Sequence, residues 1–368
     1  MAFAIFSKRL LPRVLPRFFS PRVLPRVLPQ VLFIRRRLLS ALALATVGVL
    51  GGAGSAYAQA QEQSQTQSQT PAAAPAQAGP LKVVASFSIL GDMVKQIGGS
   101  DVQLDVLVGP DGDAHEYEPT PADARRLAAA QVLVVNGLGF EAWLPKLVRA
   151  SGFKGTTVVA SEGVTPRDFS ADASGGHAHV HSGDKHDEHG HESNVDPHAW
   201  QSLANGARYA RNIGAALAAA DAAHADAYRQ RAEAYAARIE ALDARVKQAF
   251  AGLAPERRRV VTSHDAFGYF GDAYRMTFIS AMGVSTEAEP SAADVARIIG
   301  QIRQEKVPAV FFENVSSPKL AQQIARETGA RVGGTLYSDA LAKPGLPAAT
   351  YLGMFEWNLS QFMAALKQ

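Results

Sequence analysis

Apolar and polar positions alternate along residues 80–368 in a pattern that predicts strands and helices in turn. Residues 81–87 form a valine-rich apolar run that predicts a buried strand, and residues 89–97 follow with helical spacing. Further strands are predicted at 102–108, 132–135 and 156–160, and helices at 121–130 and 141–149. Thr120 is a suitable N-cap for the first of these helices. This order is typical of a parallel sheet covered on both faces.

Two helical stretches separate this unit from a second one. Helices are predicted at 201–220 and 223–250, and apolar residues in the second recur at steps of 7, 4, 3 and 4. At 1.5 Å per residue this helix would be roughly 40 Å long, and Gly252 and Pro255 end it. Strands are then predicted at 260–262, 278–280, 310–313 and 332–336, and helices at 291–305, 318–328 and 350–366.

The two alternating units predict an α/β fold of two similar parallel-sheet lobes joined by one long rigid helix. The sequence of residues 83–87 is partly repeated at 260–264, which fits two related lobes. We expect an N-terminal lobe at 80–222, a linking helix at 223–253 and a C-terminal lobe at 254–368. Ligands of such sheets bind at the carboxyl ends of the strands, so the expected site is the cleft between the lobes.

The first 79 residues lie outside this pattern. Residues 35–58 are typical of a secretory signal: three arginines, an apolar run from Leu38 to Leu50, and a small-residue cleavage site ending at Ala58. The alternative is an uncleaved anchor, although the apolar run is short for a membrane span. Residues 1–34 are a proline-rich repeat, interpreted as low complexity or a mis-assigned start, and 59–79 predict a disordered linker.

Composition and charge exclude several classes of protein. The 368 residues are 47% hydrophobic and 19% charged, which is ordinary for a globular chain. There is no cysteine, so a disulfide scaffold, a thiolate zinc finger, an iron–sulfur cluster and a lipid-anchoring cysteine are excluded. Residues 1–58 hold nine Lys or Arg and no Asp or Glu, and the remainder therefore holds 28 basic and 34 acidic residues. An acidic mature chain is a poor candidate for nucleic acid binding.

Histidines are the candidate metal ligands. A loop predicted at 170–194 holds six of them within 15 residues: His177, His179, His181, His186, His189 and His191. This tract is either a weak, multi-site metal-collecting loop or a solvated stretch with no fixed ligand set. His224 is interpreted as a surface residue. The remaining three, His115, His198 and His264, follow strands or open a helix, which makes a joint site plausible.

Several motifs from residue 80 onward resemble the zinc-binding, ZnuA-like (TroA-like) solute-binding proteins of metal ABC importers. They are Val84-Ala85-Ser86-Phe87, Ile97-Gly98-Gly99, His115-Glu116-Tyr117-Glu118-Pro119, Asn136-Gly137, Asp196-Pro197-His198-Ala199-Trp200, Thr262-Ser263-His264 and Tyr337-Ser338-Asp339. The resemblance implies that His115 and His198 from the first lobe and His264 and Asp339 from the second bind the metal. A water is the alternative to Asp339, and Glu313 could orient a ligand histidine or simply fix a loop.

The resemblance also implies a metal and a task. Zinc-binding members have histidine at the position of His264, where manganese or iron members have a carboxylate. Three imidazoles with at most one carboxylate suit a tetrahedral Zn²⁺ site, whereas Mn²⁺ favours more oxygen ligands. We therefore expect a monomeric periplasmic protein, not an enzyme, that delivers Zn²⁺ to an ABC-transporter membrane permease with its cytoplasmic ATPase.

Three alternatives remain at this point. The first is a manganese or iron-binding protein of the same family. The second is a secreted zinc hydrolase with Glu116 or Asp265 as general base, although the chain lacks a His-Glu-x-x-His helix. The third is a surface adhesin whose metal is only structural.

Overall fold

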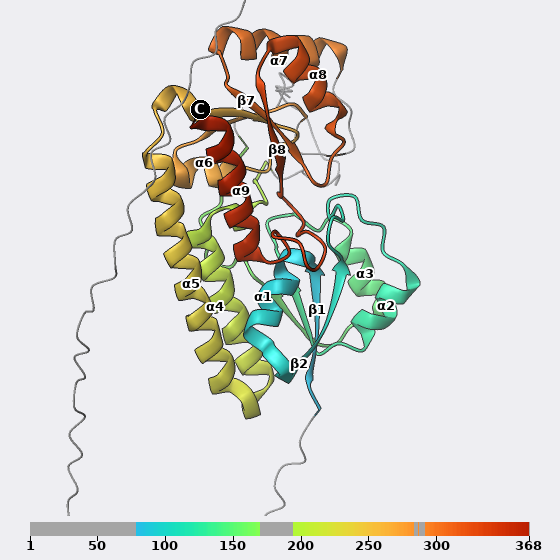
Figure 1. Ribbon diagram of the computed structural model, residues 1–368. Coiled ribbons are helices and arrows are strands. Elements are labelled where there is room, and N and C mark those ends of the chain that lie inside the picture. The colour runs from blue at the N-terminus through green and yellow to red at the C-terminus, as the bar shows by residue number, and fades with distance from the viewer. Residues whose placement is uncertain (1–78, 170–193, 283–285, 287–290, 368) are drawn as a thin grey trace, which may run out of the picture. The chain divides into compact units, whose positions relative to one another are not determined.

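Two four-stranded parallel sheets with corresponding strand orders organise the chain. The computed structural model describes residues 79–169, 194–282, 286 and 291–367, which belong to one unit, Ala72–Gln368. The first sheet has the order β2-β1-β3-β4 and the second β6-β5-β7-β8, and all neighbouring strands are parallel (Figure 1). The predicted fold of two similar parallel-sheet lobes is confirmed.

The observed elements follow the predicted order. The first lobe contains β1 (Leu81–Phe87), α1 (Ser88–Gly98), β2 (Val102–Val108), α2 (Pro121–Ala128), β3 (Val132–Val135), α3 (Leu144–Ser151) and β4 (Thr156–Val159). Two long helices come next, α4 (Leu203–Ala220) and α5 (Ala225–Ala251). The second lobe contains β5 (Arg259–Thr262), α6 (Gly268–Tyr274), β6 (Thr277–Ser280), α7 (Ala292–Glu305), β7 (Ala309–Glu313), α8 (Pro318–Thr328), β8 (Arg331–Leu336) and α9 (Tyr351–Leu366).

The sequence analysis did not predict the helix α6. The α6 helix has only seven residues, and two of them are glycines. Glycine disfavours a helix interior, and seven residues are too few for a helical period to stand out. Its place in the fold is set by packing: Phe270 of α6 lies with its ring centroid 5.5 Å from that of Phe250 in α5.

Helices cover both faces of each sheet, because alternate strand residues point to opposite sides. In the first sheet, Val84 and Leu133 pack with α2 and α3, whereas Val83 and Val134 belong to the core on the other face. In the second sheet, residues of β5 and β7 divide in the same way between α7 and α8 on one face and α6 and α9 on the other. No helix in the described ranges is long and apolar enough to cross a membrane.

One continuous apolar core connects the lobes. It includes Phe87 in β1, Trp200, Phe250 near the end of α5 and Phe362 in α9, all almost completely buried. Burial of each such side chain is worth about 1.5–3 kcal/mol. The α5 helix has 27 residues and so extends about 40 Å along this core. A wide separation of the lobes would expose these side chains, and the core therefore favours small relative movements.

A capping box begins α2 and anchors the loop before it. Thr120 Oγ1 accepts a hydrogen bond from the backbone N–H of Asp123 at 3.3 Å, and Asp123 Oδ2 accepts one from Thr120 N at 2.7 Å. The hydroxyl of Tyr117 also donates to Asp123 Oδ2, at 2.8 Å. The predicted N-cap is thus confirmed, and the cap holds the end of the loop that carries His115.

Replacing Thr120 with alanine should lower the free energy of unfolding by about 1 kcal/mol, because the first turn of α2 loses its side-chain acceptor. Thermal unfolding measures the change. As a control, Gln230→Ala on the exposed face of α5 should alter stability by less than about 0.5 kcal/mol. Equal stability of the Thr120 variant and the parent would contradict the cap.

Candidate metal centre

The loop between β2 and α2 presents His115. Its backbone N–H donates to Asp113 Oδ1 at 2.9 Å, and the carbonyl of Ala114 accepts from Trp143 Nε1 at 2.8 Å. The imidazole packs edge-on against Phe140, with ring centroids 4.8 Å apart. These contacts hold the backbone and the ring, and only 12% of the side chain is exposed.

A buried carboxylate supports His198, which precedes the short 3₁₀ turn Ala199–Gln201 that leads into α4. Asp196 Oδ1 accepts from the backbone N–H of His198 at 2.9 Å and lies 2.8 Å from the ring Nδ1. A proton on Nδ1 that points to a carboxylate leaves the lone pair of Nε2 available for a metal. Asp196 therefore fixes the orientation of the His198 ring and favours the tautomer whose Nε2 can bind a metal.

In the second lobe a buried carboxylate supports His264 in the same way. This residue follows β5, and Glu313 ends the neighbouring strand β7. Glu313 Oε1 accepts from the His264 backbone N–H at 2.9 Å, and Oε2 lies 2.6 Å from the ring Nδ1. All of these groups are buried. Of the two roles that the sequence left open for Glu313, orienting the ring and fixing the loop, its carboxylate makes the contacts of both.

Asp339 belongs by sequence to the second lobe, because it follows β8, yet the backbone around it is also hydrogen-bonded to the first. The carbonyl of Ser338 accepts from Trp200 Nε1 at 2.9 Å and from Gln201 Nε2 at 2.6 Å. Two residues beyond Asp339, the backbone N–H of Leu341 donates to Ser88 Oγ at 2.9 Å. The same segment also bonds to the second lobe, because the carbonyl of Ala340 accepts from Asn314 Nδ2 at 3.3 Å. His115 and His198 are therefore carried by the first lobe, His264 by the second, and Asp339 by a segment that bonds to both.

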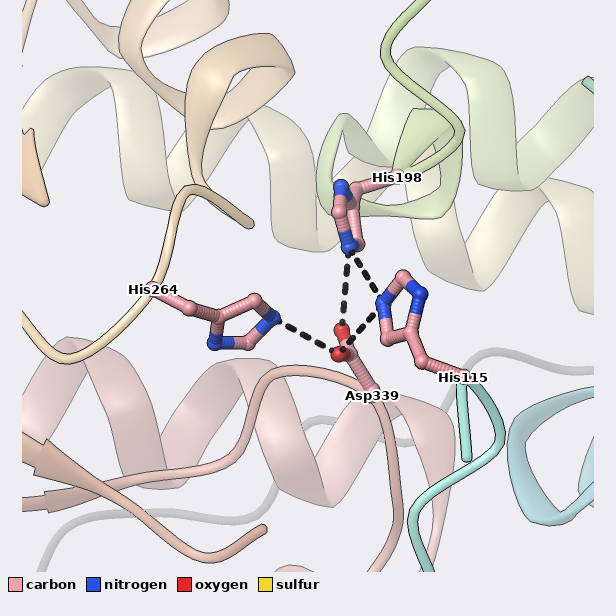
Figure 2. Close-up of side chains that lie close together, drawn as sticks. All are labelled: His115, His198, His264 and Asp339. Carbon is pink, nitrogen blue, oxygen red and sulfur yellow. Dashed lines mark hydrogen bonds and ion pairs between the residues drawn. The ribbon is translucent and has the colours of Figure 1, made fainter. Parts of the chain in front are cut away.

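The four side chains converge from four separate loops (Figure 2). One ligand atom from each of His115, His198, His264 and Asp339 lies within 4.8 Å of all the others. His115 Nε2 is 3.1 Å from His198 Nε2 and 3.3 Å from Asp339 Oδ2. Tetrahedral ligands at zinc bond lengths of about 2.0–2.2 Å lie about 3.3–3.6 Å apart. The cluster therefore has the size of a single metal site.

The electrostatics of the cluster favour a bound cation. Burial alone would raise the pKa of Asp339, but His264 and His198 lower it well below its ordinary value. Burial opposes charge on His264 as well, yet the neighbouring carboxylates of Glu313 and Asp339 raise its pKa well above the ordinary value. A buried, ionised carboxylate needs a positive partner. Either protons on the imidazoles or a metal ion can supply that charge.

The remaining candidates divide into three groups. The six histidines of the insert, His177 to His191, lie outside the described residues. His224 is a partly exposed residue whose Nδ1 lies 2.7 Å from Asp221, as expected of a surface histidine. Of the residues named for an enzyme, Asp265 is buried, but it does not belong to the four-residue cluster.

Sequence reasoning missed the partner of His198. Asp196 lies in the Asp196-Pro197-His198 motif, and its position two residues before the histidine could have identified it as the partner of the ring. It also missed Arg167, whose Nη1 donates to Asp196 Oδ2 at 2.7 Å. No local pattern marks that arginine, because its partners are 29 and more residues away.

Residues 83–365 match the family model of the zinc-uptake complex component A, ZnuA, a periplasmic protein. The chain belongs to this family. The family consists of solute-binding proteins, so the chain is not an enzyme but the substrate-binding component of a metal ABC transporter. This membership confirms the resemblance inferred from the motifs, and it excludes the hydrolase.

Three relatives place the chain within the family. The manganese ABC transporter substrate-binding lipoprotein PsaA of Streptococcus pneumoniae is 30% identical, over 78% of this chain and 89% of PsaA. The iron-binding protein YfeA of Yersinia pestis is 32% identical, over 77% of this chain and 85% of YfeA. The solved structure of the periplasmic zinc-binding protein TroA from Treponema pallidum is 30% identical, with a TM-score of 0.69 over 78% of this chain and 99% of TroA.

The Glu313→Gln variant should bind metal about 10–100-fold more weakly, because the amide no longer provides two carboxylate oxygens to the backbone and ring of His264. Metal titration against a chelator measures the affinity. Glu305→Gln, in the same lobe but paired with Arg259, is the matched control and should bind like the parent. Parental affinity of Glu313→Gln would show that the carboxylate does not support the site.

Proposed function

We propose that this chain captures Zn²⁺ outside the cytoplasmic membrane and delivers it to the permease of an ABC importer. The observation that carries the proposal is the convergence of three imidazole nitrogens on one buried carboxylate. Three nitrogen donors and one carboxylate oxygen fill a tetrahedral zinc shell, which is the geometry that this ion prefers in proteins. His115, His198, His264 and Asp339 are the proposed ligands, with Asp339 rather than a water as the fourth.

The identity of the metal rests on the donor set. Imidazole nitrogen suits zinc, whereas Mn²⁺ favours carboxylates, carbonyls and water. His264 supports zinc most directly, because a carboxylate at that position would give a site richer in oxygen. Glu313 lies behind the ring, on the Nδ1 side, and acts here as the partner of His264 rather than as a ligand.

A manganese or iron cargo is the second candidate. PsaA and YfeA, whose names specify manganese and iron, are as similar to this chain as the zinc-binding TroA is. Asp339 also has a second oxygen on the metal side, since Oδ1 lies 3.7 Å from His198 Nε2. Bidentate binding by Asp339 would supply the additional oxygen that these ions prefer.

The remaining parts of the chain fit a secreted carrier. We propose that residues 35–58 are a signal peptide cleaved after Ala58, that 59–79 form a linker and that the mature protein is a periplasmic monomer. Its partners would be the membrane permease and the cytoplasmic ATPase of the transporter. The histidines of the insert would collect metal weakly, because imidazoles and carboxylates in a polar tract suit zinc without a fixed geometry.

A chelator-competition titration should find one tight zinc equivalent in the chain that lacks residues 177–191, and excess Mn²⁺ should not displace it. The His115→Ala, His264→Ala double variant should lose this equivalent, because two of four ligands are gone. The matched control is His224→Ala, which removes a surface imidazole. Displacement by manganese would favour the second candidate, and loss of tight binding on deletion of the insert would refute the cleft site.

Zinc affinity should fall as the pH is lowered from 8 to 5.5. Protons and metal compete for the imidazole nitrogens. Because the pKa of His264 is raised, this residue binds its proton already above the ordinary histidine range, and the loss of affinity begins there. Titrations across this range measure the effect. An affinity independent of pH would contradict imidazole ligation.

A further inference from the structure

A group of charged and aromatic side chains joins the two lobes directly behind the ligand histidines. Its members are Arg167 and Asp196 from the first lobe and Gly268, Tyr269 and Asp272 from α6 of the second. We propose that Arg167 is a positioning residue that holds His198 and the α6 side of the His264 loop in register and thereby slows the release of bound metal. The inference rests on the proposed function and deepens it.

This group of five residues, named here the Arg167 joint, contacts His198 through Asp196. Arg167 Nη1 donates to Asp196 Oδ2 at 2.7 Å, while the other oxygen of Asp196 contacts the backbone and ring of His198. Asp196 is completely buried. A buried carboxylate is stable only with hydrogen-bond donors around it, and here the backbone and ring of His198 are joined by the guanidinium of Arg167, which holds the second oxygen of Asp196.

Arg167 also contacts α6. Arg167 Nε donates to Asp272 Oδ2 at 3.0 Å, and the backbone N–H of Arg167 donates to the hydroxyl of Tyr269 at 3.1 Å. The guanidinium carbon lies 5.8 Å from the centroid of the Tyr269 ring. One arginine therefore bonds to a carboxylate on each lobe with two different nitrogens, a geometry that the planar guanidinium allows and that lysine does not reproduce.

Gly268 shows how closely the lobes meet here. A Cβ atom at this position would lie 1.7 Å from Arg167 Nη1 and 2.5 Å from Asp196 Oδ2. The first residue of α6 therefore rests on the ion pair itself, and only glycine leaves room for it. His264 precedes Gly268 by four residues, in the loop that leads into α6. The joint thus connects Asp196, which supports His198, with the helix that follows the His264 loop.

The position of Arg167 predicts an effect on metal release more than on folding. Exposed ion pairs contribute little to stability, and Asp272 is 69% exposed. Loss of a group that orients a ligand commonly costs about 10–100-fold in metal affinity. Changes that weaken an existing complex act mainly on its dissociation rate. We therefore expect the loss of Arg167 to raise the dissociation rate of the bound metal.

The test compares metal release from the full chain and four variants. Stopped-flow mixing of the zinc-loaded protein with excess chelator measures the dissociation rate, and the absorption spectrum of the Co²⁺-loaded protein reports ligand geometry. Arg167→Met should release zinc at least about 10-fold faster and change the cobalt spectrum. Asp272→Asn should release it severalfold faster with an unchanged spectrum, because the contact of Arg167 with Asp196 is intact. Gly268→Ala should resemble Arg167→Met, since its methyl group displaces the guanidinium.

Arg211→Met is the matched control. Arg211 likewise joins two elements through two carboxylates, Glu233 at 3.1 Å and Glu240 at 2.9 Å, but it lies on α4 away from the ligands. This variant should release zinc at the parental rate. If Arg167→Met does not fold, the exposed Asp272 and the Gly268 variant still test the joint.

The outcomes separate the two proposals. Parental release rates and cobalt spectra in the Arg167, Asp272 and Gly268 variants would overturn the role of Arg167, even if their unfolding temperatures fell. Absence of a tight site in the parent chain would instead overturn the proposed function, on which the inference rests.

Discussion

The whole arrangement depends on the cost of burying the carboxylate of Asp339. An ionised carboxylate that is removed from water is stable only with positive charge and hydrogen-bond donors around it. Here the compensating groups are three imidazoles that arrive from three other loops. Each imidazole can be neutral or protonated, so the charge deficit can be met by protons or by a metal dication. The fold therefore builds a site whose resting state already requires a cation.

The two sheets explain why these loops meet. In each lobe the first strand of the sequence, β1 or β5, lies next to the third, β3 or β7, and the strands are parallel. The loops that follow neighbouring strands therefore leave the sheet at the same edge. His264 and Glu313 end adjacent strands of the second sheet, which is why a residue 49 positions away can support the histidine. The first lobe uses a local solution for the same purpose, with Asp196 two residues from His198. Both devices leave Nε2 facing the centre.

Periodicity was sufficient to predict most of the fold, and the family resemblance of the motifs named the four residues, His115, His198, His264 and Asp339, that the structure brings together. Long apolar strands and helices with one buried stripe, such as α5, carry their own signal in the sequence. The α6 helix does not, because two of its seven residues are glycines and its packing decides its form. The residues behind the ligands were harder to predict from the sequence. Arg167 and Asp272 are 105 residues apart, and no local pattern near either residue indicates that they pair.

The anchoring of the ligands also constrains how a bound metal can leave. His115 and His198 belong to the first lobe, and the segment of Asp339 is hydrogen-bonded to Trp200, Gln201 and Ser88 of that lobe. His264 lies on a loop of the second lobe, and the segment of Asp339 bonds to that lobe as well, through Asn314 Nδ2 and the carbonyl of Ala340. Because the apolar core spans both lobes, a large opening would expose buried aromatic side chains. Under the proposed function, a small displacement of the second lobe would withdraw His264 Nε2 from the metal while His115 and His198 stay with the first lobe. Such a step would open one place in the coordination shell to an acceptor at limited cost.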